Sequence, residues 1–106
     1  MNSSRLEQLK AFLEKDPNDP FILYAIATEY RNESPEKSRK YYEGLLKNHP
    51  EYLATYYHAA ILFAEFGDDE LAEQTFKKGI ALAQNQGNDL SLRELQNAYN
   101  EFLFDD

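Results

Sequence analysis

The chain has 106 residues, a formal charge of −8 and no cysteine, which is enough length for one domain with a modest core. The lack of cysteine excludes disulfides and thiolate metal sites. The excess of acids argues against binding to nucleic-acid backbone or anionic lipid, which requires clustered lysine and arginine. No apolar run approaches the roughly 20 residues of a membrane span, so we expect a cytoplasmic protein with no membrane partner.

The first predicted helix covers residues 4–16. Its start has capping-box spacing between Ser4 and Glu7, in which each side chain reaches the other's free backbone N–H. Its end falls at Asp16, because Pro17 disfavours helical dihedrals in the residue before it. One helical face carries Leu6, Leu9, Phe12 and Leu13.

Two further helices form a predicted hairpin between residues 17 and 50. Each begins with a capping residue followed by proline at the first helical position, where the missing N–H needs no partner. The first of these helices is expected to end around Arg31-Asn32, and His49-Pro50 ends the second as Asp16-Pro17 ended the helix before. The capping pairs are Asp19-Pro20 and Ser34-Pro35, and the apolar faces are Leu23, Ile26, Ala27 and Tyr30, then Ser38, Tyr41, Tyr42, Leu45 and Leu46.

Residues 53–83 predict a second hairpin around one sharp turn. Gly67 stops its first helix, because glycine reaches left-handed dihedrals without a Cβ clash. Asp68 and Asp69 suit the start of the next helix, where a carboxylate caps free N–H groups. Gly79 lies inside that helix and indicates the close approach of a neighbour. The apolar faces are Tyr56, Ala59, Ala60 and Phe63, then Leu71, Ala72, Phe76, Gly79, Ile80 and Ala83.

The last predicted helix covers residues 88–103. Gly87 is a good stop for the helix before it, and Asn88 or Asp89 caps the new one. The residues from 104 onward are expected to fray. The apolar face is Leu92, Leu95, Tyr99 and Phe102.

The two hairpins repeat one pattern. Pro17 and Pro50 are 33 residues apart in the numbering, and a shift of that length superimposes the apolar faces of the two first helices. For the second helix of each hairpin the shift is one residue longer, and Ser38 then aligns with Ala72. A period of about 34 residues is the sequence signature of a helical repeat array.

At these positions the chain resembles the tetratricopeptide repeat family. The family pattern has a bulky, a medium, a small and an aromatic residue on the first helix, then alanine, an aromatic residue, a small residue and proline. One repeat has Tyr56, Ala59, Ala60, Phe63, Ala72, Phe76 and Gly79 there, and the other has Leu23, Ile26, Ala27, Tyr30, Ser38, Tyr42, Leu45 and Pro50. Departures from the pattern are Leu23 for tryptophan, Ser38 for alanine, Leu45 for a small residue and Gln84 for proline.

The resemblance implies an all-α fold, a right-handed α-α superhelix of about two hairpins in a single domain over residues 1–106. Residues 4–16 are the expected helix of a truncated N-terminal half-repeat. Residues 17–50 form the first repeat, 51–86 the second, and 88–103 the C-terminal capping helix. Because a hairpin buries its apolar face only against neighbours, the terminal helices must cover the open ends.

A second apolar stripe lies on the first helix of each repeat, about 130° from the core face. In tetratricopeptide arrays these positions line the concave groove that holds a partner. The resemblance therefore implies a groove floored by Phe21, Tyr24, Tyr57 and Ile61, with Ala54 on the same stripe and Thr28, Arg31, His58 and Glu65 near its edges. Two alternatives are that the helix of residues 53–66 is apolar because it is buried, and that the terminal helix folds back into the groove.

The predicted function is protein–protein interaction. Because only Arg31 is basic near the groove, a clamp for acidic peptide tails is disfavoured, and an apolar or amphipathic helix with basic flanks fits better. The alternative is a self-assembling structural module, a homodimer formed through the same stripe. The sequence has no glycine-rich phosphate loop, nucleophile elbow or metal-ligand spacing, so we expect no catalytic residues, no metal, no cofactor and no nucleic-acid partner.

Overall fold

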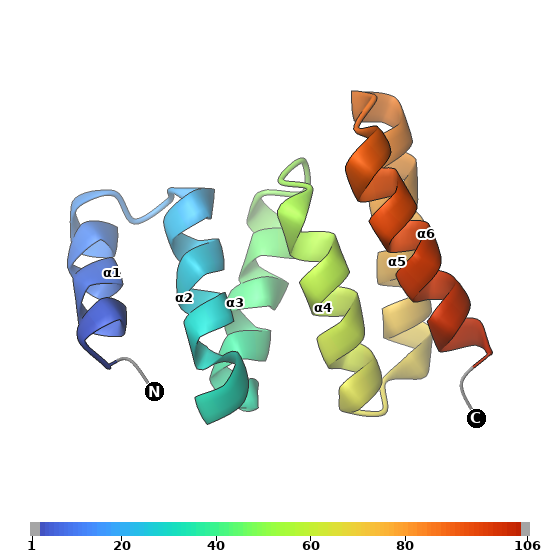
Figure 1. Cartoon of the computed structure of the whole chain (residues 1–106). Coiled ribbons are helices and arrows are strands. Elements are labelled where there is room, and N and C mark those ends of the chain that lie inside the picture. The colour runs from blue at the N-terminus through green and yellow to red at the C-terminus, as the bar shows by residue number, and fades with distance from the viewer. Residues whose placement is uncertain (1–2, 105–106) are drawn as a thin grey trace. The chain divides into compact units, whose positions relative to one another are not determined.

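The computed structural model describes residues 3–104, and within them the chain is helical between short connections (Figure 1). No strand occurs among these residues. The chain divides into two compact units, one up to Tyr52 and one from Leu53 onward. The first contains α1 (Ser3–Lys15), α2 (Pro20–Glu33) and α3 (Pro35–Asn48), and the second contains α4 (Ala54–Glu65), α5 (Asp69–Gln86) and α6 (Asp89–Leu103).

Most of the predicted helix ends are confirmed. The Asp19 carboxylate accepts a hydrogen bond from the backbone N–H of Phe21 at 2.9 Å, and the Asn88 side chain accepts one from Ser91 at 3.0 Å. Gly67 and Gly87 adopt left-handed φ values of 84° and 68°, and both lie just past helix ends, where a Cβ would be strained.

Four details differ from the predicted ends. Helix α1 already includes Ser3, so Ser4 lies inside the helix instead of capping it. Ser34 and Asp68 hold the N-cap positions of α3 and α5, but neither side chain makes a capping hydrogen bond. Helix α2 continues to Glu33 because the backbone N–H of Ser34 reaches the Tyr30 carbonyl at 2.7 Å, which holds the last turn closed.

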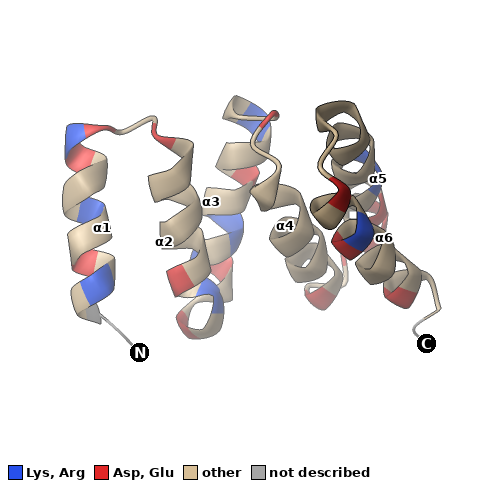
Figure 2. Cartoon of the chain, turned by 45° about the horizontal axis from the view of Figure 1, so that its top comes forward, with Lys and Arg blue, Asp and Glu red and all other residues tan. Residues whose placement is uncertain are grey.

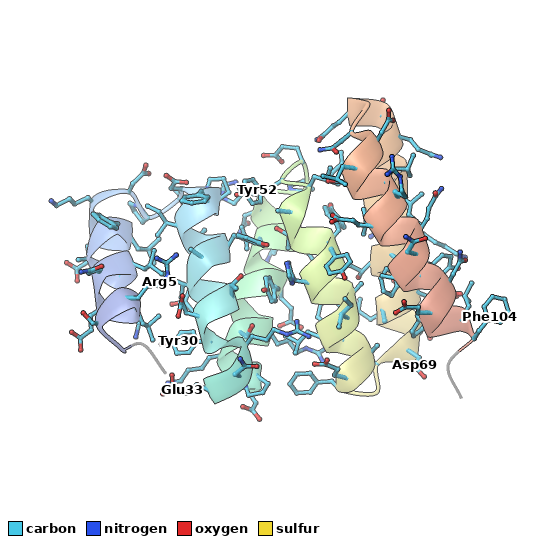
Figure 3. All side chains as sticks on the ribbon, viewed as in Figure 1. Arg5, Tyr30, Glu33, Tyr52, Asp69 and Phe104 are labelled. Carbon is cyan, nitrogen blue, oxygen red and sulfur yellow. The ribbon has the colours of Figure 1, made fainter. Side chains whose placement is uncertain are left out.

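In the first unit, α1 packs against α2 around a small cluster of apolar side chains. Leu9, Ile26 and Tyr30 are buried there. The ion pair between Arg5 and Glu29, 2.6 Å from Nε to Oε1, also joins the two helices. Figure 3 shows Arg5 on α1 and Tyr30 on α2. Phe12, predicted on the core face, is 56% exposed. It lies at the edge of the stripe, and one partner helix covers only a narrow stripe.

The ring of Tyr30 links all three helices of this unit. The Lys10 ammonium of α1 and the Lys37 ammonium of α3 each lie 5.4 Å from its centre, a distance suited to cation–π attraction. A stacked contact with the Tyr41 ring, 5.9 Å between centres, adds a second link to α3.

Helices α2 and α3 are joined by buried polar contacts and by tyrosine rings. The Ser38 hydroxyl donates to the Ala27 carbonyl at 2.7 Å, and the hydroxyls of Thr28 and Tyr42 are 3.2 Å apart. The Tyr24 ring lies 6.4 Å from that of Tyr42 and 5.9 Å from that of Tyr52. Burial raises the pKa of all three tyrosines, because it disfavours the phenolate.

In the second unit, three helices meet at Gly79. A Cβ at this position would lie 2.7 Å from the Tyr56 Cβ of α4 and 3.2 Å from the Leu95 Cδ2 of α6. The predicted close approach is therefore confirmed. The ring of Phe76, also on α5, lies 5.6 Å from those of Tyr99 and Phe102 of α6, and the Tyr99 hydroxyl donates to Glu73 at 3.0 Å.

We predict opposite effects for the same substitution at two helical glycines. In Gly79→Ala the added methyl group clashes with the Tyr56 Cβ and pushes α4 away from α5. We expect this change to lower the free energy of unfolding by about 1–3 kcal/mol. Gly44→Ala raises it by about 0.5–1 kcal/mol, because the added Cβ has no described atom within 4 Å apart from its chain neighbours and the nearby backbone of its own helix. Urea unfolding followed by circular dichroism measures both. Stabilisation by both substitutions would contradict the close approach at Gly79.

We also predict a loss of stability at alkaline pH. A raised pKa means that folding favours the protonated phenol, so this stabilisation is complete below the unfolded tyrosine pKa, near 10. It is lost as pH rises through the higher folded values. Unfolding free energies measured between neutral pH and about pH 11 should fall less steeply in Tyr42→Phe than in the original chain. Because this variant also loses the contact with Thr28, the slopes are compared and not the absolute values; equal slopes would contradict the prediction.

Candidate functional site: a groove between α4 and α6

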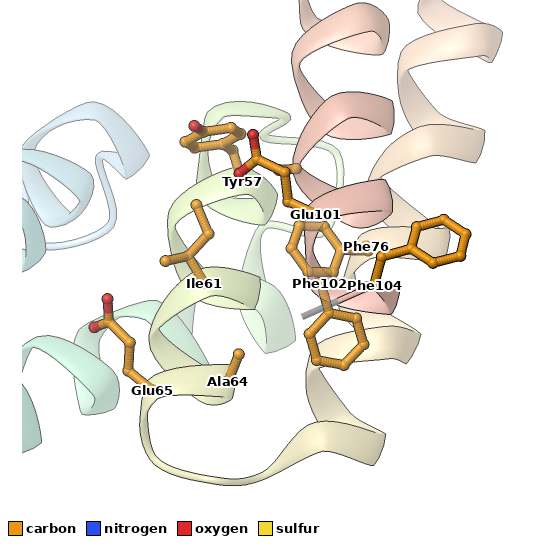
Figure 4. A pocket seen from close by; sticks show the side chains of 9 residues that line it. Tyr57, Ile61, Ala64, Glu65, Phe76, Glu101, Phe102 and Phe104 are labelled. Atoms are coloured by element: carbon orange, nitrogen blue, oxygen red, sulfur yellow. The ribbon is translucent and has the colours of Figure 1, made fainter. Parts of the chain in front are cut away.

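A groove of about 760 Å³ opens between α4 and α6 in the second unit (Figure 4). Helix α4 supplies one wall and α6, with the residue just past its end, supplies the other. Phe76 of α5, which is almost fully buried, closes the groove between them. The lining residues are Tyr57, Ile61, Ala64, Glu65, Phe76, Ala98, Glu101, Phe102 and Phe104.

The α4 wall follows from helical spacing. Tyr57, Ile61 and Ala64 are separated by four and three residues, so they share one face of the helix. All three are half-buried, whereas the core face of α4, which includes Tyr56 and Phe63, is buried. Helix α4 is thus apolar on two faces, one in the core and one in the groove.

The α6 wall is the part that the sequence pattern did not reveal. Ala98, Glu101 and Phe102 share a face at steps of three and one. Phe102 was expected only as a core residue, and it both contacts Phe76 and lines the groove. Phe104, expected to fray, holds the C-cap of α6 through its backbone N–H, which donates to Asn100 at 3.1 Å. Its side chain is 82% exposed. The four-residue spacing of Ala98 and Phe102 is the feature of the sequence that could have indicated this wall.

Of the residues predicted as partner contacts on α4, three line this groove: Tyr57, Ile61 and Glu65. Ala54, at the start of α4, is exposed and lies outside the lining. His58 is half-buried and also outside it, and its ring meets that of Tyr57 edge-on at 5.2 Å. Helix α6 forms a wall of the groove and leaves it open.

The other predicted contacts lie on α2, in the first unit. Phe21 is 62% exposed at the start of the helix. Tyr24 is half-buried against two tyrosine rings of its own unit. Thr28 is exposed, and its hydroxyl donates to the Tyr24 carbonyl at 3.0 Å. Arg31 is half-buried in the last turn of α2.

Charge is distributed unequally along the chain. Residues 1–52 contain nine acids and eight bases, a net charge of −1, whereas residues 53–106 contain ten acids and three bases, a net charge of −7. Figure 2 shows the basic positions on α1 and α3 and the acidic ends of α4 and α6. Within the groove lining, Glu65 and Glu101 are the charged residues, and both are acidic.

Neither a metal site nor a membrane span is found in the described part of the chain. No three histidine, aspartate or glutamate side chains within residues 3–104 come together as metal ligands would. Among the helices of the same range, none combines the length and the apolar character needed to cross a bilayer.

Comparisons with known proteins agree with the helical repeat fold. No family model and no curated protein matches the chain, but solved structures do. The crystal structure of a tetratricopeptide repeat domain protein from Salinibacter ruber has a TM-score of 0.78 and 30% identity, over 83% of this chain and 100% of that one. A solution NMR structure of a tetratricopeptide repeat domain protein from the same organism has a TM-score of 0.76 and 33% identity, over 82% and 89%.

A third structure, of a protein from Bordetella parapertussis, has a TM-score of 0.77 and 21% identity over 92% of this chain and 86% of that one, a likeness that concerns the fold alone. The resemblance inferred from the two aligned hairpins is confirmed by the closer pair, as is the all-α helical repeat fold. The chain belongs to the tetratricopeptide repeat family.

Proposed function

We propose that the protein binds a peptide or helix of a protein partner in the groove between α4 and α6. The observation that carries the proposal is the second apolar face of α4, which the core of its own unit leaves only half covered. Tyr57 and Ile61 on this face oppose Phe102 across the groove. An amphipathic helix laid in a groove uses apolar anchors of this kind.

The exposed apolar surface supports binding energetically. Each Å² of apolar surface removed from water contributes about 25 cal/mol, and aromatic side chains dominate interface energetics because they are large. Phe104, 82% exposed at the edge of the groove, is the largest such contribution that the lining offers to a partner.

Binding is favoured over catalysis by the composition of the lining. Its polar groups are two carboxylates and one phenol, with no histidine, serine or lysine beside them. A nucleophile with an adjacent base, which covalent catalysis needs, is thus missing from the groove. Phe21, Tyr24, Thr28, Arg31, Ala54 and His58 are proposed as further contacts from the repeat register alone.

The test compares two aliphatic residues of the second unit. Ile61→Gln changes the groove wall, whereas Leu90→Gln changes a residue of α6 that is 63% exposed and outside the lining. Proteins captured from a lysate of the source cells by the original chain should also be captured by Leu90→Gln. Capture by Ile61→Gln should fall about tenfold, as expected when an anchor loses about 1.4 kcal/mol.

Circular dichroism and a thermal melt establish that both variants are folded. If Ile61→Gln unfolds, Ala64→Asn replaces it, because this change is smaller and lies on the same wall. Equal capture by a folded groove variant and by Leu90→Gln would refute the proposal. Sedimentation of the original chain tests the homodimer alternative: a dimer that Ile61→Gln dissociates would assign the groove to self-association instead.

A further inference from the structure

We infer that the groove selects a positively charged partner segment, in which lysine or arginine stands beside a large apolar side chain. The inference rests on the proposed function and specifies the chemistry of the partner at that site. Three features of the second unit point to it: the charges of the lining, the helix ends and the net charge of the unit.

The charges of the lining have one sign. Glu65 comes from the end of α4 and Glu101 from α6, so each of the two helices contributes a carboxylate to the lining. In Figure 4 Glu101 points toward Tyr57 of α4, whereas Glu65 lies at the outer side of α4. No lysine, arginine or histidine is among the lining residues. A partner with acidic groups at these places would meet like charges, which are unfavourable across an interface.

The helix ends add negative potential at the same place. The C-terminus of a helix carries about half a negative charge, which a basic residue in the last turn normally offsets. Every helix of the first unit has such a residue: Lys15, Arg31 and Lys47. Helices α4 and α6 have none, and α5 has none either.

Part of the groove lining lies at these two helix ends, which have no basic residue in the last turn. Ala64 and Glu65 close α4, while Glu101 and Phe102 belong to the last turn of α6. The two helix ends and the two lining carboxylates therefore all contribute negative potential to this side of the unit. A cation supplied by the partner would be attracted to that potential, and its position would correspond to that of Lys47 in the last turn of α3.

The apolar part of the lining specifies what accompanies the cation. Lysine and arginine lay their aliphatic stems on apolar surface while their charged ends stay in water, and both are attracted to the faces of aromatic rings. Tyr57, Phe102 and Phe104 provide such rings. From Tyr57 to Glu65 is eight residues, about 12 Å along α4, so an anchor at one end and a cation at the other fit two turns of a partner helix.

The same charges disfavour a second copy of the chain as the occupant. Its net charge is −8, and its acidic unit would bring more negative charge to an acidic groove. Complementary charge mainly raises association rate and specificity, while the apolar contacts hold the partner. We therefore assign the groove to a basic amphipathic segment of another protein.

The experiment selects peptides from a displayed library of random 16-residue sequences. Binders of the full chain are kept only when they fail to bind Ile61→Gln, so the survivors depend on the groove. We expect the survivors to carry a net positive charge, with lysine or arginine within one or two helical turns of leucine, phenylalanine or another large apolar residue.

Two further variants separate local from general attraction. The double substitution Glu65→Gln with Glu101→Gln removes both lining acids, whereas Asp69→Asn with Glu70→Gln removes two acids at the start of α5. Measured by fluorescence anisotropy, affinity for a selected peptide should fall about fivefold to tenfold in the first variant, as two partly exposed charge pairs allow. It should change less than twofold in the second.

Each outcome decides a specific point. Groove-dependent peptides that are neutral or acidic would overturn the inference and leave the proposed function standing. Basic peptides whose affinity falls equally in both double variants would also overturn it, because the attraction would then belong to the whole unit. A library that yields no peptide sensitive to Ile61→Gln would overturn both.

Discussion

The second unit depends on the close contact at Gly79, where three helices meet because residue 79 has no side chain. Tyr56 of α4 and Leu95 of α6 both reach the backbone of α5 at this residue. Close packing of this kind is intolerant of added volume. Because α4 and α6 supply the two walls of the groove, the contact that positions these helices in the core also sets the separation of the walls.

The helical framework could be predicted from the sequence because most helix boundaries have a local cause. Proline after Asp19 and after Ser34, and glycine at 67 and 87, fix helix ends through backbone sterics that need no tertiary information. The core face of α4 was predictable for the same reason, since Tyr56, Ala59, Ala60 and Phe63 recur at helical spacing and all are buried.

The groove was only partly predictable, because a surface between helices depends on where the second helix lies. The α4 wall came from a stripe that the core did not need. The α6 wall could not be predicted in this way, because Phe102 contacts the core and also lines the groove, whereas its helical spacing indicated only a core position. The prediction that Phe12 lies in the core was wrong for a different reason. An apolar residue at helical spacing is buried only if another element covers its side of the helix.

The missing basic residues at the ends of α4 and α6 imply a compromise between stability and function. Installing lysine in either last turn would improve the match to the helix dipole by about 0.3–1 kcal/mol. The same change would neutralise the potential that the groove presents. A variant engineered for thermal resistance by matching charges to helix dipoles would acquire these lysines and lose that potential, so these two helix ends are the ones to leave unaltered.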